Sequence, residues 1–190
     1  MSEKVRDSII EVARETFARY GFRKTTMDEI AIAARKGKSS LYYYFASKEE
    51  VFQAVVEQEA GILFAKIEHA VKEQTNAREK LIAYVLVRMK GFHDFVNYYD
   101  ALKNDFLSKI EFIEKIREKH DQKEQASIAR ILEEGIQSGE FRKLNIELTA
   151  RTVVIALRGL EEPYFLTGED VDLEKHLKDL LHILFHGIAT

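Results

Sequence analysis

The chain has 190 residues and a formal net charge of −3, and its 46% hydrophobic and 32% charged residues suit one sizeable core or a small domain beside a larger one. It contains no cysteine, which excludes disulfide frameworks, thiolate metal sites and cysteine nucleophiles, and its single proline and scarce strand-like alternation favour an all-α fold. No apolar run approaches the ~20 residues that span a bilayer and the N-terminus has no signal-peptide core, so we expect a cytoplasmic protein without membrane contact.

The first helix is predicted over residues 3–20. Its apolar residues recur every three or four positions and form one stripe that we expect to be buried, made of Val5, Ile9, Ala13, Phe17 and Tyr20. Gly21 follows as the C-terminal cap. We interpret this helix as the packing partner of the motif that comes after it.

Residues 26–45, TMDEIAIAARKGKSSLYYYF, predict two short helices joined by a tight turn, which together form a helix-turn-helix. Thr26 and Glu29 have the spacing of a capping box. In the turn, Gly37 is the one residue that tolerates a left-handed backbone without strain. The second helix, residues 38–44, directs Leu41 and Phe45 inward. Its outward residues carry hydroxyls, phenols and a cation, which bond phosphate oxygens and base edges: Lys38, Ser39, Ser40, Tyr42 and Tyr43.

Positive charge is concentrated in this region. Residues 23–48 hold six cations and two anions, a net +4, so the rest of the chain carries −7. A basic end on an acidic body is the asymmetry expected of a protein that turns one face toward phosphate.

The same region resembles the DNA-binding domain of the TetR (tetracycline repressor-like) family of transcriptional regulators. The resemblance covers about the first 55 residues and rests on Gly21-Phe22, Thr25-Thr26, Leu41-Tyr42-Tyr43-Tyr44-Phe45 and Ser47-Lys48-Glu49. The turn departs from the family pattern, because Arg35 stands where the family usually has glycine, Lys36 where it usually has a small apolar residue, and Gly37 where it often has serine.

The resemblance implies that Thr26 and Lys48 lie at helix N-termini that touch phosphate, where backbone N–H groups already favour an anion. Three successive helical residues point about 100° apart, so we expect Tyr44 to pack while its two neighbours face DNA. The two cations of the turn are further candidates for phosphate contacts. The predicted DNA-binding residues are Thr26, Arg35, Lys36, Lys38, Ser39, Ser40, Tyr42, Tyr43 and Lys48.

The rest of the chain predicts further helices, about nine in all. Ser47 and Glu50 form a second capping box, and the helix that they begin extends to about Val71 with Ile62 in its buried stripe, a rod of roughly 35–40 Å. The remaining helices are predicted over residues 77–99 and 146–166, capped by asparagines, over 108–138 and 173–188, and as a short piece within 100–109. We expect a DNA-binding domain over residues 1–47 and a ligand-binding and dimerisation domain over 48–190.

Aromatic residues crowd the middle of the chain. Core packing explains most of them, but members of the TetR family commonly hold a small-molecule pocket among these helices, and aromatic walls suit an apolar ligand. Arg88 and Arg158 fall inside apolar helices, where each is either a snorkelling side chain or the counter-charge of an anionic ligand. The predicted pocket residues are Arg88, Phe92, Phe95, Tyr99, Phe106 and Phe112. The charge-dense residues 111–125 are expected to form a solvated face.

Surplus apolar surface in the last two helices predicts a homodimer. The middle of residues 146–166 is apolar nearly all round and should be buried on more than one side, and residues 173–188 carry a broad stripe. Two such helices from each chain would form a four-helix bundle through Val154, Leu157, Leu177, Leu181, Leu184 and Phe185.

No catalytic motif is present, so we expect neither an enzyme nor a cofactor. His182 and His186 have the spacing of metal ligands, but no nearby carboxylate or cysteine completes a site, and we interpret them as surface or interface residues without a metal. The sequence predicts a dimeric repressor that binds a palindromic operator in double-stranded DNA and is released by a small-molecule inducer. One alternative is a helix-turn-helix regulator without a small-molecule effector, controlled by a partner protein or acting as an activator; a small helical enzyme is a third.

Overall fold

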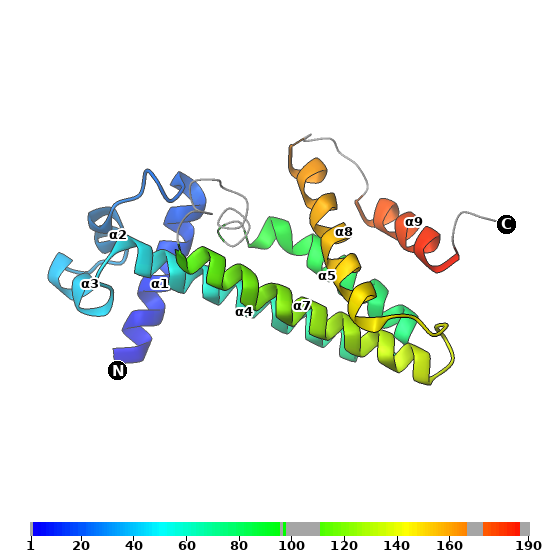
Figure 1. Ribbon diagram of the computed structural model, residues 1–190. Coiled ribbons are helices and arrows are strands. Elements are labelled where there is room, and N and C mark those ends of the chain that lie inside the picture. The colour runs from blue at the N-terminus through cyan, green and yellow to red at the C-terminus, as the bar shows by residue number, and fades with distance from the viewer. Residues whose placement is uncertain (1, 96, 98–110, 167–172, 187–190) are drawn as a thin grey trace. The chain divides into compact units, whose positions relative to one another are not determined.

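The computed structural model describes residues 2–95, 97, 111–166 and 173–186, and every regular element in these ranges is a helix (Figure 1). The eight helices described are α1 (Ser2–Tyr20), α2 (Met27–Ala33), α3 (Lys38–Tyr44), α4 (Lys48–Lys72), α5 (Ala77–Asp94), α7 (Glu111–Gln137), α8 (Ile146–Leu166) and α9 (Leu173–His186). The predicted all-α fold is confirmed, and the short helix expected within residues 100–109 lies outside the described ranges. None of the described helices is long and apolar enough to cross a membrane.

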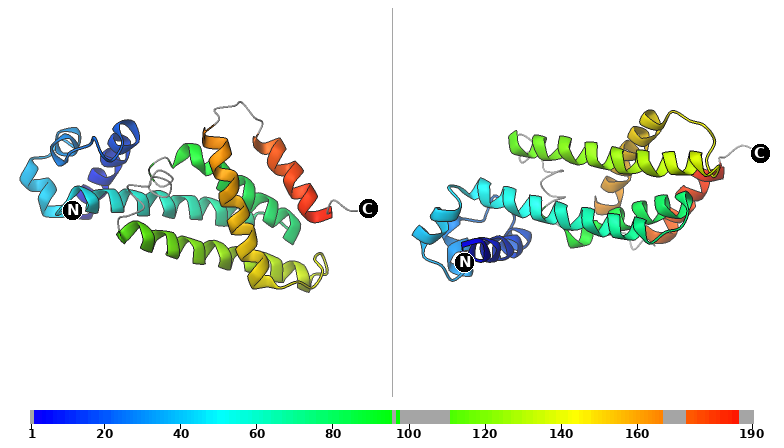
Figure 2. Two further views of the ribbon diagram at one scale, coloured as in Figure 1. Left: turned by 45° about the horizontal axis from the view of Figure 1, so that its top comes forward. Right: turned by 90° about the horizontal axis from the view of Figure 1, so that it is seen from below.

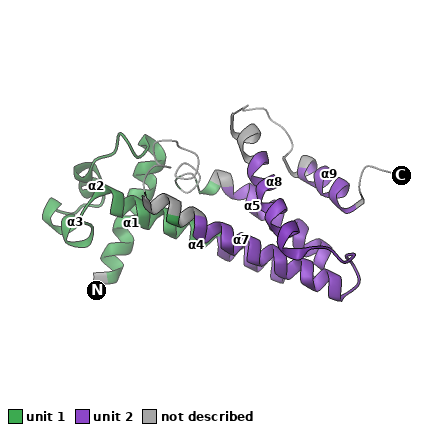
Figure 3. Cartoon of the chain, viewed as in Figure 1, with its two compact units in different colours: residues 1–63, 92–117 green, residues 64–91, 118–190 purple. Residues whose placement is uncertain are grey.

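The chain divides into two compact units (Figure 3). Unit 1 comprises residues 1–63 and 92–117, and unit 2 comprises residues 64–91 and 118–190. The continuous helix α4 contributes residues to both units, as does α5. The domain boundary expected after residue 47 stays a prediction.

Several helices begin at the residues that their capping signals predict. The Thr26 hydroxyl accepts the Glu29 N–H at 3.3 Å, and the Glu29 carboxylate accepts the Thr26 N–H at 2.8 Å, which completes the predicted capping box. At the start of α4 the reciprocal bond is displaced by one residue, because the Glu50 carboxylate accepts the N–H of Ala46 at 2.8 Å. Ser47 accepts the Glu50 N–H at 3.2 Å, as expected.

The connection that follows α7 also caps α5. Gly139 has a left-handed backbone, with φ of 80°, which an L side chain would strain. The next residue, Glu140, accepts the N–H groups of Ala77 at 3.1 Å and Arg78 at 3.2 Å. The bond from Ala77 is the largest cause that lowers the pKa of the Glu140 carboxyl, and a further bond from Ser138 acts in the same direction. One short loop therefore ends α7 and begins α5.

The core of unit 1 is built around three phenylalanines. Phe17 and Phe52 meet edge to face with ring centroids 5.0 Å apart, and Phe22 lies 4.8 Å from Phe52. This cluster joins α1 to α4, while α1 packs on α2 and α2 on α3 (Figure 2). The expected burial of Tyr20 and Ile62 was wrong, since both side chains are exposed. Each continues an apolar period in sequence, but no element covers it within the described chain.

A buried polar contact ties the segment after α5 to the first and fourth helices. The Asn97 side-chain amide donates to the backbone oxygen of Arg14 at 3.0 Å and to the Glu59 carboxylate at 2.8 Å. Asn97 and Glu59 are 3% and 1% exposed. A buried carboxylate without donors is costly, so this amide stabilises Glu59 and ties Asn97 to α1 and α4.

In unit 2, α5 and α7 run antiparallel, as two ion pairs that connect them in reversed order show. Lys80 pairs with Glu134 at 2.5 Å, and Arg88 pairs with Glu124 at 2.5 Å. The expectation that residues 111–125 form a solvated face was wrong in part, since Glu124 and His120 are buried. These two residues continue the buried stripe of Ile128 and Ile131 at helical spacing, so α7 turns Glu124 toward Arg88 of α5 and His120 toward Phe64 of α4.

Candidate nucleic-acid interface

The turn between α2 and α3 closes α2 in a Schellman motif. The Lys36 N–H donates to the Ala31 carbonyl at 2.9 Å, and the Arg35 N–H donates to the Ile32 carbonyl at 3.0 Å. This pattern requires a left-handed residue directly after the cap, and Arg35 adopts it with φ of 54°. Among the described residues it is the one non-glycine with positive φ.

Gly37, the residue of the turn that tolerates a left-handed backbone without strain, does not adopt it. Gly37 is the N-cap of α3 with an extended backbone, at φ of −69° and ψ of 150°, which any residue adopts. The hydrogen bonds of the Schellman motif, rather than glycine content, select the left-handed position. Arg35 and Lys36 are both exposed, so the turn presents two cations.

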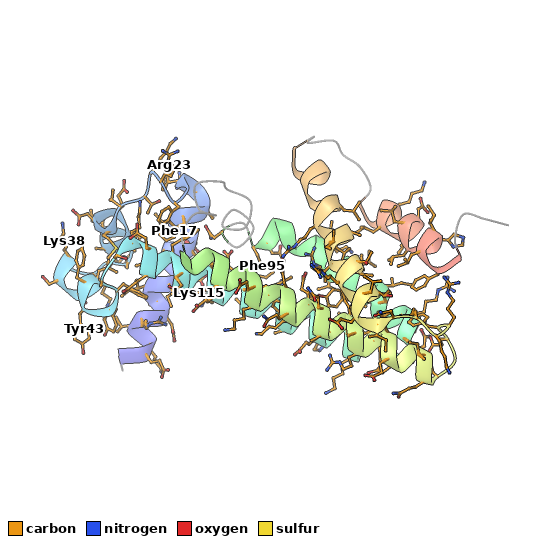
Figure 4. The ribbon with its side chains drawn as sticks, viewed as in Figure 1. Phe17, Arg23, Lys38, Tyr43, Phe95 and Lys115 are labelled. Atoms are coloured by element: carbon orange, nitrogen blue, oxygen red, sulfur yellow. The ribbon has the colours of Figure 1, made fainter. Side chains whose placement is uncertain are left out.

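Helix α3 has one buried face and one exposed face, as predicted. Leu41 and Phe45 are buried, and Lys38, Ser39, Tyr42 and Tyr43 are exposed, while Ser40 and Tyr44 are half-buried. Tyr43 is 79% exposed, and its ring meets the Tyr44 ring edge to face at 5.0 Å. Figure 4 shows Lys38 and Tyr43 projecting outward from this helix. An α-helix that presents hydroxyls, phenols and a cation in this way suits the major groove of a duplex.

The Lys38 ammonium is paired within the motif. It lies 2.8 Å from the Asp28 carboxylate of α2, and the hydrogen bond and charge of Asp28 raise the pKa of Lys38. Both side chains are mostly exposed, so solvent and phosphate can compete for either. The pair places an anion beside a residue predicted to contact DNA.

Two further residues predicted to contact phosphate, Lys48 and Thr26, already make hydrogen bonds within the domain. Lys48 donates to the Phe22 backbone oxygen at 2.9 Å, and its ammonium lies 4.4 Å from the Phe22 ring centroid. The Thr26 hydroxyl belongs to the capping box. A truncation of Lys48 therefore removes a contact that holds α4 to the chain after α1, which makes it a poor test of phosphate binding alone.

The residues of the predicted pocket are only partly described. Arg88 is buried in unit 2 and Phe95 is buried in unit 1. Phe92 and Phe112 lie on α5 and α7, but their side chains are outside the described part of the chain, as are Tyr99 and Phe106. The sequence missed Glu124, the partner of Arg88, although its place in the buried stripe of α7 was a usable signal.

The predicted dimer residues divide into two groups. Val154, Leu157, Leu177 and Leu181 are buried within the single chain, and their assignment to a dimer interface stays a prediction. Leu184 is exposed and Phe185 is half-buried. The middle of α8 is buried on one side only, and the opposite side exposes apolar residues that the prediction omitted, Leu148 and Ile155.

Comparison with known proteins gives consistent matches along the chain. Residues 9–55 match the family model for bacterial regulatory proteins of the tetR family, and residues 106–181 match the tetracyclin repressor-like C-terminal domain. The chain is 29% identical over 194 residues to the HTH-type transcriptional repressor KstR2 of Mycolicibacterium smegmatis, covering 97% of this chain and 90% of that protein. It is 27% identical over 186 residues to the fatty acid metabolism regulator protein of Bacillus subtilis, covering 95% and 93%.

The fold also matches solved structures. The transcriptional regulator FadR from Bacillus subtilis in complex with stearoyl-CoA superposes with a TM-score of 0.79 at 22% identity, covering 96% of this chain and 98% of that one.

Proposed function

The chain belongs to the TetR family of bacterial regulatory proteins and is a DNA-binding transcriptional regulator, and we propose that it represses its target genes until a long-chain acyl ligand releases it from DNA. The observation that carries the proposal is the exposed face of α3, which follows a capped α2 and a tight turn. As a protein that binds chromosomal DNA, it would act in the cytoplasm.

On DNA, α3 would lie in the major groove. Ser39, Tyr42 and Tyr43 would contact base edges, and Lys38 would contact phosphate once it leaves Asp28. The exposed cations of the turn, Arg35 and Lys36, would add phosphate affinity. The roles of Thr26, Ser40 and Lys48 are supporting ones, since each is half-buried or already hydrogen-bonded within the domain.

The ligand class comes from the relatives. One similar protein is named for fatty acid metabolism, and a structure with the same fold was solved with stearoyl-CoA. We infer that the helices between α4 and α8 bind a ligand with a long acyl chain. The alternative of a regulator without a small-molecule effector is an outcome of the test below.

Release from DNA needs a link between the two regions. Helices α4 and α5 contribute residues to both units, and Asn97 holds the chain beyond α5 to α1 and α4. A ligand that shifts α5 would therefore act on α1 and α4, which carry the helix-turn-helix. Such coupling is typically about 1–3 kcal/mol, or roughly 5- to 150-fold in affinity, and operator DNA must weaken the ligand by the same factor.

A palindromic operator requires a two-fold dimer. Exposed apolar side chains on α8 and α9 support a homodimer through these helices: Leu148, Ile155, Ile183 and Leu184. The paired substitution Ile155→Glu with Leu184→Glu should give monomers in sedimentation. Ile62→Glu, which changes an exposed apolar residue of α4, should leave the dimer intact. A double variant that stays dimeric would move the interface elsewhere.

The function is tested by selecting bound duplexes from a random pool and measuring their affinity with and without stearoyl-CoA, using free coenzyme A as the control. We expect an enriched inverted repeat and an affinity that falls at least about fivefold with stearoyl-CoA. Enrichment without any effect of acyl ligands would favour a regulator controlled by a partner protein. No enrichment would contradict the assignment of α3 as a reading helix.

A further inference from the structure

A buried ion pair joins α5 to α7. The Arg88 guanidinium donates from Nε to Glu124 Oε1 at 2.5 Å and from Nη2 to Oε2 at 3.2 Å, a bidentate arrangement. The two residues are 4% and 6% exposed. Lys80 and Glu134 connect the same two helices, but their side chains are 23% and 43% exposed.

A buried pair of this kind is an expensive way to join two helices. Desolvation of both charges offsets much of their attraction, and apolar residues of similar volume stabilise as well or better. Between this pair and Lys80–Glu134, α5 and α7 already bury apolar residues: Leu81, Val85, Ile128 and Ile131. Stability alone therefore does not account for the pair.

Other buried polar groups surround it. Tyr84 lies one turn before Arg88 on α5, and His120 lies one turn before Glu124 on α7, and both are buried. The His120 ring stacks on Phe64 with centroids 4.9 Å apart. In such a low-dielectric setting, only an anion can replace Glu124, because an uncharged group would leave the Arg88 charge unneutralised.

We propose that Arg88 binds an anionic head group of the effector, and that the Glu124 carboxylate occupies this anion site in the ligand-free protein. The proposal rests on the proposed function and names the chemistry of the head group: two oxygens that bear one negative charge, as in a fatty-acid carboxylate or in either phosphate of the coenzyme A diphosphate. Exchange of one anion for another keeps the buried guanidinium neutralised. The displaced carboxylate turns toward the exposed Lys119 and Lys123 on the adjoining face of α7.

The first test is Glu124→Gln, which should raise the affinity for anionic ligands. Removal of the resident anion leaves Arg88 with an amide, so the affinity for stearate and for stearoyl-CoA should rise about tenfold, although the melting temperature falls. Octadecanol has the same chain without a charge, and its affinity should stay the same. A purely structural pair would lower the melting temperature without changing ligand preference.

A double variant that removes both charges tests the proposal in a protein that should still fold. Arg88→Met with Glu124→Leu should fold, since apolar replacement of a buried pair is tolerated. It should lose about 10- to 100-fold in affinity for anionic ligands, the value of a charge-assisted hydrogen-bonded contact. Lys80→Met with Glu134→Leu, the matched pair between the same helices, should keep wild-type affinities.

Dissociation constants for stearate, stearoyl-CoA and octadecanol are measured by calorimetry on the full-length wild type and these variants. A response limited to one of the two anions identifies that anion as the source of the head group. Unchanged affinities for both anions in the Arg88→Met/Glu124→Leu variant would overturn the anion site, while release of DNA by stearoyl-CoA would still uphold the proposed function. A wild type that binds none of the three would instead overturn the acyl ligand class.

Discussion

Replacement of Arg35 by glycine should stabilise the protein while weakening DNA binding. Arg35 has φ of 54°, a conformation that costs an L residue roughly 1–2 kcal/mol. Glycine avoids that cost but loses about 0.5–1 kcal/mol in backbone entropy. The net gain is about 0.5–1 kcal/mol, or a rise of roughly 1–4 °C in melting temperature for a chain of this size.

Arg35→Ala is the matched control, because it removes the same side chain and charge but keeps the strained backbone. The two variants should therefore differ in stability by the net gain above and bind DNA alike. Each should lower the slope of log affinity against log salt by about 0.9 if Arg35 contacts one phosphate. Urea unfolding gives the stability difference, and fluorescence anisotropy over a range of salt gives the slope.

Equal stability of the glycine and alanine variants would refute the left-handed assignment of Arg35. An unchanged salt slope in both would show that the side chain does not contact phosphate.

Three further predictions concern single positions. Gly135→Ala should destabilise by about 1–3 kcal/mol in urea unfolding, because an added Cβ would overlap the Phe141 ring, whereas Gly61→Ala, with open space around it, should not destabilise. Asp28→Asn should raise affinity for any duplex several-fold at low salt, since it removes an anion and frees Lys38; an unchanged affinity would mean that Lys38 does not reach DNA. Burial, with a smaller contribution from nearby lysines, lowers the pKa of His120 to about 4. Between about pH 6.5 and pH 4, His120 is therefore protonated in the unfolded chain but neutral in the folded chain. The free energy of unfolding should fall by up to about 3 kcal/mol over this range. The His120→Leu variant should lack this fall in stability. Urea unfolding between pH 6.5 and pH 4 measures it, and a fall that persists in the variant would contradict the prediction.

Local signals predicted the helix boundaries well. Thr26, Asn76 and Asn145 begin helices because their side chains accept backbone N–H groups that have no partner within the helix. Gly21 and Gly139 end helices because they adopt positive φ. These effects act within one turn of the chain, so they can be recognised without knowledge of the tertiary structure.

The burial of single side chains and the position of the left-handed residue depend on tertiary structure and were not predicted. Tyr20 satisfies the apolar period of α1, but burial also requires a neighbouring element, which periodicity does not reveal. Gly37 is intrinsically better suited to a left-handed backbone than Arg35, yet the register of the hydrogen bonds that end α2 places the strain on Arg35. Glu124 looked solvated because its neighbours in sequence are charged, whereas its neighbours at helical spacing are buried.

The candidate site shows the same division. The exposed face of α3 was predicted, because Leu41 and Phe45 fix which side of the helix is buried. The dimer residues stay a prediction, because an apolar stripe does not tell whether its partner is the same chain or a second copy. Val154 and Leu181 pack within the chain, and Ile155 lies on the opposite side of α8.

The central claim is that the exposed face of α3 reads DNA sequence, and Tyr43→Ala tests it most directly. The measurement is the ratio of affinities for a selected duplex and for a shuffled duplex of equal length, with Tyr20→Ala as an exposed-tyrosine control on α1. We expect Tyr43→Ala to lower the ratio about tenfold or more by weakening the selected duplex alone, while the control keeps the wild-type ratio. An unchanged ratio in Tyr43→Ala would contradict the claim.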